Sequence, residues 1–218
     1  MSKLKAIIFD ADGTLLNSFE LIVAAYAHVA KVHGLKSPTA EEVRMQLGRS
    51  LPDIYRTFYP DHDVEPLLAE NSSFISANAG QSSAFEGVSD LLDALTGAGL
   101  KVAILTSGGH RIHDVLEHHG IKQYFSSIVH HESITNPKPD PEGFFLAVKE
   151  CGVTAGEAAM VGDSVQDILA GKNGKAGLVV GVTHGFGKRE DLEKAGADIL
   201  VDTIEELGKV LQDSSISV

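Results

Sequence analysis

Two aspartates follow a short apolar run near the start of the chain. The residues Ala6 to Phe9 are all apolar, a length that suits a buried strand better than a helix. Asp10 and Asp12 come next, and because side chains alternate along a strand, both carboxylates are expected on the same side. Two neighbouring anions repel each other unless a cation lies between them or one pKa is raised. The pair therefore predicts a site for a hard metal ion such as Mg2+ or a carboxyl that holds a proton, although Asp and Gly also occur in ordinary turns.

Two later segments offer groups suited to a phosphate. Thr106 ends the run KVAIL, and its hydroxyl, with the backbone N–H groups of Ser107 and Gly108, could bind phosphate oxygens. Lys138 lies between two prolines, which restrict the backbone beneath it. A fixed ammonium group there could balance the charge of Asp10 and of a phosphoryl group.

A second pair of carboxylates follows the apolar run AAMVG. Asp163 and Asp167 are spaced so that both lie on one face of the first turn of a helix. Carboxylates at this position also stabilise a helix N-terminus without any catalytic role.

The elements that must position these groups alternate between strand and helix from residue 88 onward. Such alternation predicts an α/β fold, a doubly wound and mostly parallel sheet with a Rossmann-like arrangement, in which ligands bind at the carboxyl ends of the strands. The strands are expected at 101–106, 127–130, 158–162, 178–182 and near 198–201, and the helices at 89–97, 112–119, 141–151, 165–174 and 204–211.

The segment between the first strand and this region has apolar residues at helical spacing only. It predicts a small all-helical domain inserted after the first strand, at residues 16–85, with the core formed by 1–15 and 86–218. Helices are expected at about 21–34, 42–47, 51–58 and 64–77, joined to the core by the linkers 16–18 and 78–86.

The segments FDADGT, LTSGG, NPKPDP and VGDSVQD resemble, in order, the four signature motifs of the haloacid dehalogenase superfamily of phosphohydrolases. The resemblance implies that Asp10 is the nucleophile, that Asp12 is the general acid and base, and that Lys138 stabilises the phosphoryl group. It implies a Mg2+ site formed by Asp10, the backbone oxygen of Asp12, and Asp163. Asp167 is then expected to contact these ligands or a water molecule bound to the ion, and not the ion itself.

The helical insertion resembles the small helical cap of this family, and the region after the motifs resembles its phosphoglycolate phosphatase-like branch. Substrate specificity is then expected around Gly48 and Arg49, and at His110. Asn17 and Glu86 depart from the residues that many members of this branch carry.

Composition limits the function classes. The 218 residues have a formal net charge of -12, which argues against a partner among nucleic acids or anionic membranes. No apolar segment has the length of a membrane span or an N-terminal signal, so the chain is expected to be cytoplasmic. The single cysteine, Cys151, is expected to pack in a helix, and the adjacent His130 and His131 to lie on the solvated surface.

The motifs favour a Mg2+-dependent phosphatase acting on a small phosphorylated metabolite, resembling phosphoglycolate, through an aspartyl phosphate. Alternatives of the same fold are a phosphosugar mutase similar to β-phosphoglucomutase and an inorganic pyrophosphatase. A non-catalytic binding protein would be favoured if one of the motif residues were replaced, and none is. A monomer and a homodimer are both compatible with the sequence, and the C-terminal tail SSISV is expected to fray.

Overall fold

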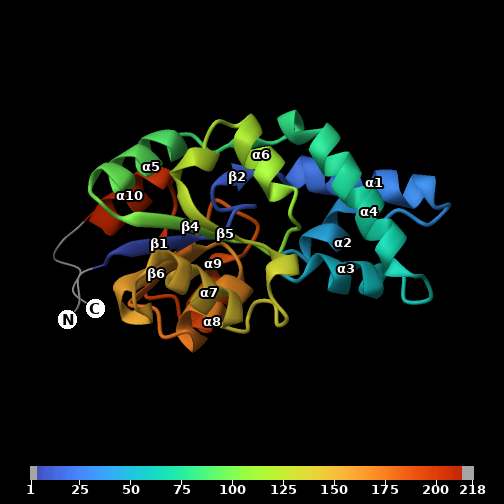
Figure 1. Cartoon of the computed structure of the whole chain (residues 1–218). Helices are drawn as coiled ribbons and strands as arrows, with labels where there is room; N and C mark the ends of the chain where they lie inside the picture. Colours follow the sequence, from blue (N-terminus) through green and yellow to red (C-terminus); the bar gives the residue numbers. More distant parts are fainter. Residues whose placement is uncertain (1–3, 213–218) are drawn as a thin grey trace.

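Strand β1 (Ala6–Phe9) lies inside a six-stranded sheet in which every neighbouring pair is parallel. The computed structural model describes residues 4–212, so the tail SSISV lies outside the described part. The strand order is β5-β4-β1-β6-β7-β8, which confirms the predicted parallel α/β fold (Figure 1). The other strands of the sheet are β4 (Lys101–Leu105), β5 (Phe125–Val129), β6 (Ala158–Gly162), β7 (Leu178–Val182) and β8 (Ile199–Val201).

Helices cover both faces of this sheet because β1 is apolar on both sides. Ile7 and Phe9 pack in one cluster with α5 (Val88–Gly97), α6 (Ile112–His118) and α10 (Ile204–Gln212). Ala6 and Ile8 pack on the opposite side against α7 (Glu142–Cys151). All four strand residues are fully buried, and each larger side chain contributes about 1.5–3 kcal/mol through that burial. The site that follows β1 is therefore built on the rigid centre of the molecule.

Two more helices flank the outer part of the sheet. Helix α8 (Val165–Asn173) packs on β6 and β7. Helix α9 (Arg189–Ala195) was not predicted; it is short and largely exposed, and Leu192 alone among its residues is buried.

Cys151 is buried in α7, as predicted. None of the helices in the described part combines the length and hydropathy needed to span a bilayer.

Four helices between β1 and α5 form a layer to one side of the sheet (Figure 1), called here the helical layer. They surround an apolar cluster of their own, in which the ring centres of Tyr26 and Tyr55 lie 4.9 Å apart. Side-chain caps begin three of them, at Thr39, Ser50 and Asp63. The helices are α1 (Phe19–Val32), α2 (Ala40–Arg44), α3 (Leu51–Phe58) and α4 (Val64–Ala77). The predicted helix at 42–47 thus begins and ends earlier.

The two segments predicted as linkers pair with each other. Strands β2 (Leu16–Asn17) and β3 (Ser83–Ala84) form a two-stranded antiparallel sheet. A 3-10 turn, Ala79–Gln81, precedes β3. The chain enters the helical layer through β2 and returns from it through β3. Because the two strands pair, their backbone N–H and C=O groups form hydrogen bonds with each other.

Candidate active site

The carboxyl ends of three adjacent strands place the predicted residues together. Asp10, Thr106 and Asp163 are the residues directly after β1, β4 and β6. Because β1 lies between β4 and β6, Asp10 is in the middle. The side chains of Asp10, Thr106 and Asp163 are all buried.

Lys138 reaches this point from the segment before α7. Its Nζ donates to Oδ1 of Asp10 at 2.7 Å, to Oδ1 of Asp167 at 2.5 Å and to the carbonyl of Leu105 at 3.1 Å. These acceptors match the three N–H donors of an ammonium group. Burial alone would lower the pKa of Lys138, but the attraction of Asp10 and Asp167 is stronger and raises it. Lys138 is therefore charged and fixed against Asp10.

Asp167 uses both carboxylate oxygens on protein donors. Oδ1 binds Lys138, while Oδ2 accepts from the backbone N–H of Ser164 at 2.9 Å and from its hydroxyl at 2.6 Å. The Ser164 hydroxyl in turn accepts from the backbone N–H of Asp167, which completes a capping box at the start of α8. Asp167 thus both caps a helix and orients Lys138, a pairing that the sequence analysis missed.

Asp163 is held by two loops. Its Oδ1 accepts from the Thr14 hydroxyl at 3.2 Å, and its Oδ2 accepts from the backbone N–H of Phe186 at 2.7 Å. Gly13 (φ +86°) lies so close that a Cβ there would collide with the Asp163 carboxylate. The contribution of Phe186 was also missed; the glycines on either side of it, at 185 and 187 after β7, were a signal for a close backbone approach.

Three buried carboxylates form a group that suits a metal ion. One oxygen from each of Asp10, Asp163 and Asp167 lies within 4.8 Å of the others. Burial is the main cause that raises the pKa of Asp10 well above its usual range, even with Lys138 adjacent. Burial, and then repulsion by Asp167, raises the pKa of Asp163 to about 7. Lys138 supplies a single positive charge to these three carboxylates. A divalent cation would offset the remaining negative charge.

Asp12 is partly buried and lines the same cavity as Asp10. Burial raises its pKa, and this effect exceeds the opposing effects of the Ser18 hydroxyl and of Lys138. A Cβ on Gly108 would lie 3.8 Å from Oδ2 of Asp12, so this carboxyl faces the loop after β4. It is placed beside Asp10 with a raised tendency to hold a proton, which a general acid requires.

The loop after β4 carries the predicted phosphate-binding groups, and two of these groups, the Thr106 hydroxyl and the backbone N–H of Gly108, are bonded to each other. The Thr106 hydroxyl accepts from the backbone N–H of Gly108 at 3.0 Å. The Ser107 hydroxyl donates to the carbonyl of Gly48 at 3.0 Å. Ser107 therefore joins this loop to the helical layer, and its predicted binding of phosphate through the backbone stays a prediction.

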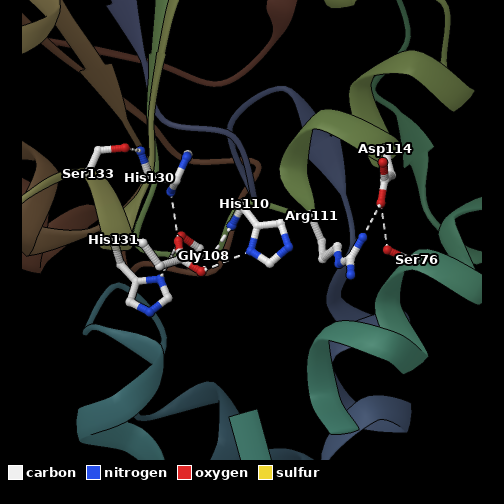
Figure 2. A network of polar contacts seen from close by, with 9 residues as sticks. Ser76, Gly108, His110, Arg111, Asp114, His130, His131 and Ser133 are labelled. Atoms are coloured by element: carbon white, nitrogen blue, oxygen red, sulfur yellow. Dashed lines mark hydrogen bonds and ion pairs between the residues drawn. The ribbon is translucent and has the colours of Figure 1, made fainter. Parts of the chain in front are cut away.

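Glu132, just beyond β5, binds the same loop through its carboxylate. Figure 2 shows His110, His130 and His131 close to Gly108 of this loop. Its Oε1 accepts from the backbone N–H of His110 at 3.2 Å, and the rings of His110, His130 and His131 place Nδ1 at 3.2, 2.7 and 3.0 Å from its carboxylate. His131 also donates its backbone N–H to the carbonyl of Gly108 at 3.0 Å. His130 and His131 are thus half-buried and bonded, not freely solvated as predicted.

A cavity of about 680 Å³ opens above Asp10 between the sheet and the helical layer. Gly48 and Arg49 line it, whereas His110 lies outside its lining and its ring binds Glu132. The position of His110 gives no support to its predicted role in specificity. Lys188, beyond the predicted site, also lines the cavity.

The parallel sheet with an aspartate cluster at its carboxyl edge defines a hydrolase of the haloacid dehalogenase type. Residues 7–180 match the haloacid dehalogenase-like hydrolase family, and the protein belongs to this family. The predicted resemblance is confirmed.

Named relatives and a solved structure agree with this assignment. Pyrophosphatase PpaX of Bacillus velezensis is 32% identical over 178 residues, which cover 78% of this chain and 80% of that protein. Phosphoglycolate phosphatase of Vibrio parahaemolyticus is 29% identical over 225 residues, covering 97% and 98%. The crystal structure of a hydrolase from Pseudomonas syringae has a TM-score of 0.84 and 27% identity, covering 99% of this chain and 100% of that one. The chain is thus similar to phosphatases with two different substrates.

Proposed function

We propose that the protein is a Mg2+-dependent phosphatase that cleaves a small phosphorylated metabolite through an aspartyl phosphate on Asp10. The observation that carries this proposal is the buried contact of 2.7 Å between Lys138 and Asp10. An aspartate whose one oxygen is fixed by an ammonium group has its other oxygen available for attack on phosphorus.

Asp10 and Asp12 divide the chemistry between them. A carboxylate oxygen of Asp10 forms a bond to phosphorus while the bond from phosphorus to the leaving oxygen breaks, and Asp12 donates its proton to that oxygen. Asp12 then takes a proton from a water molecule, whose oxygen displaces Asp10 and releases inorganic phosphate. The raised pKa of Asp12 suits the first of these steps.

Asp10, Asp163 and the backbone oxygen of Asp12 would hold Mg2+. When bound, the ion would supply positive charge that offsets the charge of the phosphoryl oxygens. Both carboxylate oxygens of Asp167 already accept hydrogen bonds, one from Lys138 and the other from Ser164. This supports the proposal that Asp167 does not bind the ion directly.

The helical layer would act as a cap that excludes water and contacts the leaving group. The contact from Ser107 to Gly48 supports this role because it joins the layer to the catalytic loop. The formal charge of -12 supports a small-molecule substrate in preference to nucleic acid or a membrane surface, and we propose a cytoplasmic monomer or homodimer.

An inorganic pyrophosphatase is a second candidate, supported by the relative whose name is Pyrophosphatase PpaX. A phosphosugar mutase would use the same groups but keep the phosphoryl group on the enzyme while the sugar exchanges. Measuring released phosphate against isomerised sugar phosphate, and diphosphate against monoesters, separates these activities.

The substitution Asp10→Asn tests the proposed nucleophile. We expect the hydrolysis of an aryl phosphate to fall by at least about a thousandfold, as it does when a covalent catalyst loses its nucleophile. Asp61→Asn, in an exposed turn, is the control and should retain activity. Mass spectrometry of acid-quenched wild-type protein should detect a phosphoryl adduct on the peptide that contains Asp10. Full activity of Asp10→Asn would disprove the assignment.

A further inference from the structure

Three buried polar atoms without a hydrogen-bond partner belong to residues that line the cavity. Residues 4–212 hold four such side-chain atoms, Ser18 Oγ, Tyr26 Oη, Arg111 Nε and His184 Nδ1, and His184 alone is outside the lining. Such atoms are rare because burial of an unpaired polar group is costly. The Ser18 hydroxyl partly opposes the burial that raises the pKa of Asp12, which connects Ser18 with the catalytic group. Tyr26 and Arg111 have no such connection.

Arg111 presents an unused edge of its guanidinium group to the cavity it lines. Its Nη1 pairs at 3.4 Å with Asp114, which accepts from the Ser76 hydroxyl at 2.6 Å (Figure 2). Nε is buried without a partner, and within the described part of the chain Nη2 makes no hydrogen bond. Nε and Nη2 together form the edge through which an arginine binds two oxygens of a carboxylate or a phosphate. The contact with Asp114 leaves this edge free for a ligand.

The Tyr26 hydroxyl is a second donor that is held in place without a partner. Tyr26 is 1% exposed, and its ring centre lies 4.9 Å from that of Tyr55 and 5.7 Å from that of Phe58. Burial, followed by the neighbouring Tyr55 and Tyr59, raises the pKa of Tyr26 well above its usual range, so the hydroxyl keeps its proton. Tyr26 is thus a rigid donor in the cavity wall.

The charged side chains that line the cavity outside the catalytic group are mostly cationic. Arg44 lies over the ring of Phe19, and Arg49 donates to the Thr57 hydroxyl, so both have neutral partners. The whole protein carries a formal charge of -12, so the excess of positive charge is local to the cavity. Such an excess attracts an anion. The four cations are Arg44, Arg49, Arg111 and Lys188, and the two acidic residues are Glu41 and Asp191.

The position of Arg111 along the chain relates it to the leaving group. A Cβ on Gly108 would lie 3.8 Å from Oδ2 of Asp12, the proposed general acid. A general acid must lie beside the leaving oxygen that it protonates. Arg111 follows Gly108 by three residues and lines the same cavity. Arg111 therefore lies on the side of the cavity where the leaving group departs, whereas Lys138 serves the phosphoryl group.

We propose that Arg111, together with Tyr26, binds a second anionic group of the substrate, a carboxylate or a phosphate carried by the leaving alcohol. This proposal rests on the phosphatase function proposed above and names the residues and the charge that select the substrate. Nε and Nη2 of Arg111 would bind two oxygens of the anion, and the Tyr26 hydroxyl would donate to another oxygen of the leaving group. The cavity of about 680 Å³ leaves room for a leaving group of several carbon atoms.

Pairs of esters that differ mainly in charge test the proposal. The phosphate esters of 3-hydroxypropanoate and 4-hydroxybutanoate are compared with those of the corresponding amides, and the bisphosphate of 1,3-propanediol with its monophosphate, all with Mg2+. We expect kcat/KM to be at least about tenfold higher for the anionic member, as one hydrogen bond to a charged group implies. The pair with the larger ratio shows whether the anion is a carboxylate or a phosphate. Ratios below tenfold in every pair would overturn the proposal.

The substitution Arg111→Gln locates the preference. It should reduce the ratio of anionic to amide ester to below about threefold and leave the amide within about twofold of the wild type. Arg111→Lys should keep part of the ratio, because it retains the charge but not two adjacent N–H donors. Arg56→Gln is the matched control: Arg56 also pairs with an aspartate three residues away, but it is outside the cavity lining. A ratio unchanged in Arg111→Gln would refute the proposal, because a merely structural role would slow both esters together.

The substitution Tyr26→Phe removes only a hydroxyl that has no partner in the protein. We expect an unchanged or higher melting temperature, since a buried unpaired group is lost, but a KM for the anionic ester that rises by at least about threefold. Tyr59→Phe is the control, because its hydroxyl donates to the carbonyl of Lys36 at 3.0 Å and Tyr59 is outside the lining. That control should lower the melting temperature and leave KM unchanged. An unchanged KM in Tyr26→Phe would refute the place of Tyr26 in the site.

Binding of non-hydrolysable phosphonates separates this proposal from the proposed catalysis. Calorimetry on the wild-type protein with Mg2+ should give a Kd for 4-phosphonobutanoate at least about tenfold lower than for 4-phosphonobutanamide. That result without turnover of any ester would refute the phosphatase function and keep the anion site. Equal Kd values alongside rapid ester hydrolysis would refute the anion site and keep the phosphatase.

Discussion

Asp167 accepts a hydrogen bond of 2.5 Å from Lys138, and both side chains are buried. The same carboxylate caps α8 through Ser164, so the start of this helix sets the position of the ammonium group. Lys138 in turn holds Asp10. A helix cap and a catalytic ion pair are thus one connected unit.

Replacement of Lys138 by Met should destabilise the protein as well as inactivate it. The variant leaves the carboxylates of Asp10 and Asp167 buried without their cation, and loss of one partner from a buried pair costs about 3–5 kcal/mol. Urea denaturation measures the free energy of unfolding. Addition of Mg2+ should recover part of the loss, because the ion replaces some of the missing positive charge. Unchanged stability would show that these carboxylates are protonated in the variant at no cost.

In the metal-free protein, the contribution of Asp163 to the free energy of unfolding should decline as the pH rises from about 4 to about 7. The pKa of this buried carboxyl is raised to about 7, whereas that of an unfolded aspartate is near 3.9. The folded state binds more protons than the unfolded state in this window, so the free energy of unfolding falls with pH.

Urea denaturation at several pH values in the presence of a chelator, compared between wild type and Asp163→Asn, isolates this contribution. The variant should show a weaker decline between the same pH values. Mg2+ should oppose the decline in the wild type, because the ion binds the ionised carboxylate. Identical pH profiles for the two proteins would contradict the raised pKa.

Glu132→Gln should weaken the binding of phosphate. Burial raises the pKa of Glu132, but its backbone hydrogen bond and the contacts from His110 and His131 prevail and lower it to about 2, so the carboxylate is charged. Its loss removes hydrogen bonds that hold the loop after β4. We expect KM to rise about tenfold with a smaller change in kcat. Glu117→Gln, which breaks an exposed ion pair with Lys122, should change neither. A purely structural role for Glu132 would lower the melting temperature and leave KM unchanged.

Gly48→Ala should reduce kcat/KM by about tenfold or more. The glycine has φ +91°, and a Cβ there would lie 2.7 Å from Gln166 and 2.8 Å from Ser164. The methyl group would push the helical layer away from the catalytic loops and strain the contact from Ser107. Gly34→Ala is the matched control: it has φ +67° but nothing within 4 Å of the added atom. Equal activities of the two variants would show that only backbone strain matters.

Local sequence signals were sufficient for the strands of the six-stranded sheet, most helices and the motif residues, whereas the short strands β2 and β3 lie in segments predicted as linkers. The apolar run before Asp10 and the alternation after residue 88 depend on side-chain period, which is a property of the segment itself. Parallel order then required Asp10, Thr106 and Asp163 to meet at one edge of the sheet, because ligand-binding groups follow the strands at their carboxyl ends.

Contacts between distant segments were decided only by the tertiary structure. The pairing of Lys138 with Asp167, the backbone N–H of Phe186 on Asp163, and the turn of His110 toward Glu132 leave no periodic trace in the sequence. Each depends on how the loops pack after the sheet has formed, where burial makes an unpaired charge or N–H group costly. The sequence by itself determined which groups could act on a phosphate. The packed loops decided which of those groups face Asp10 and which hold the others in place.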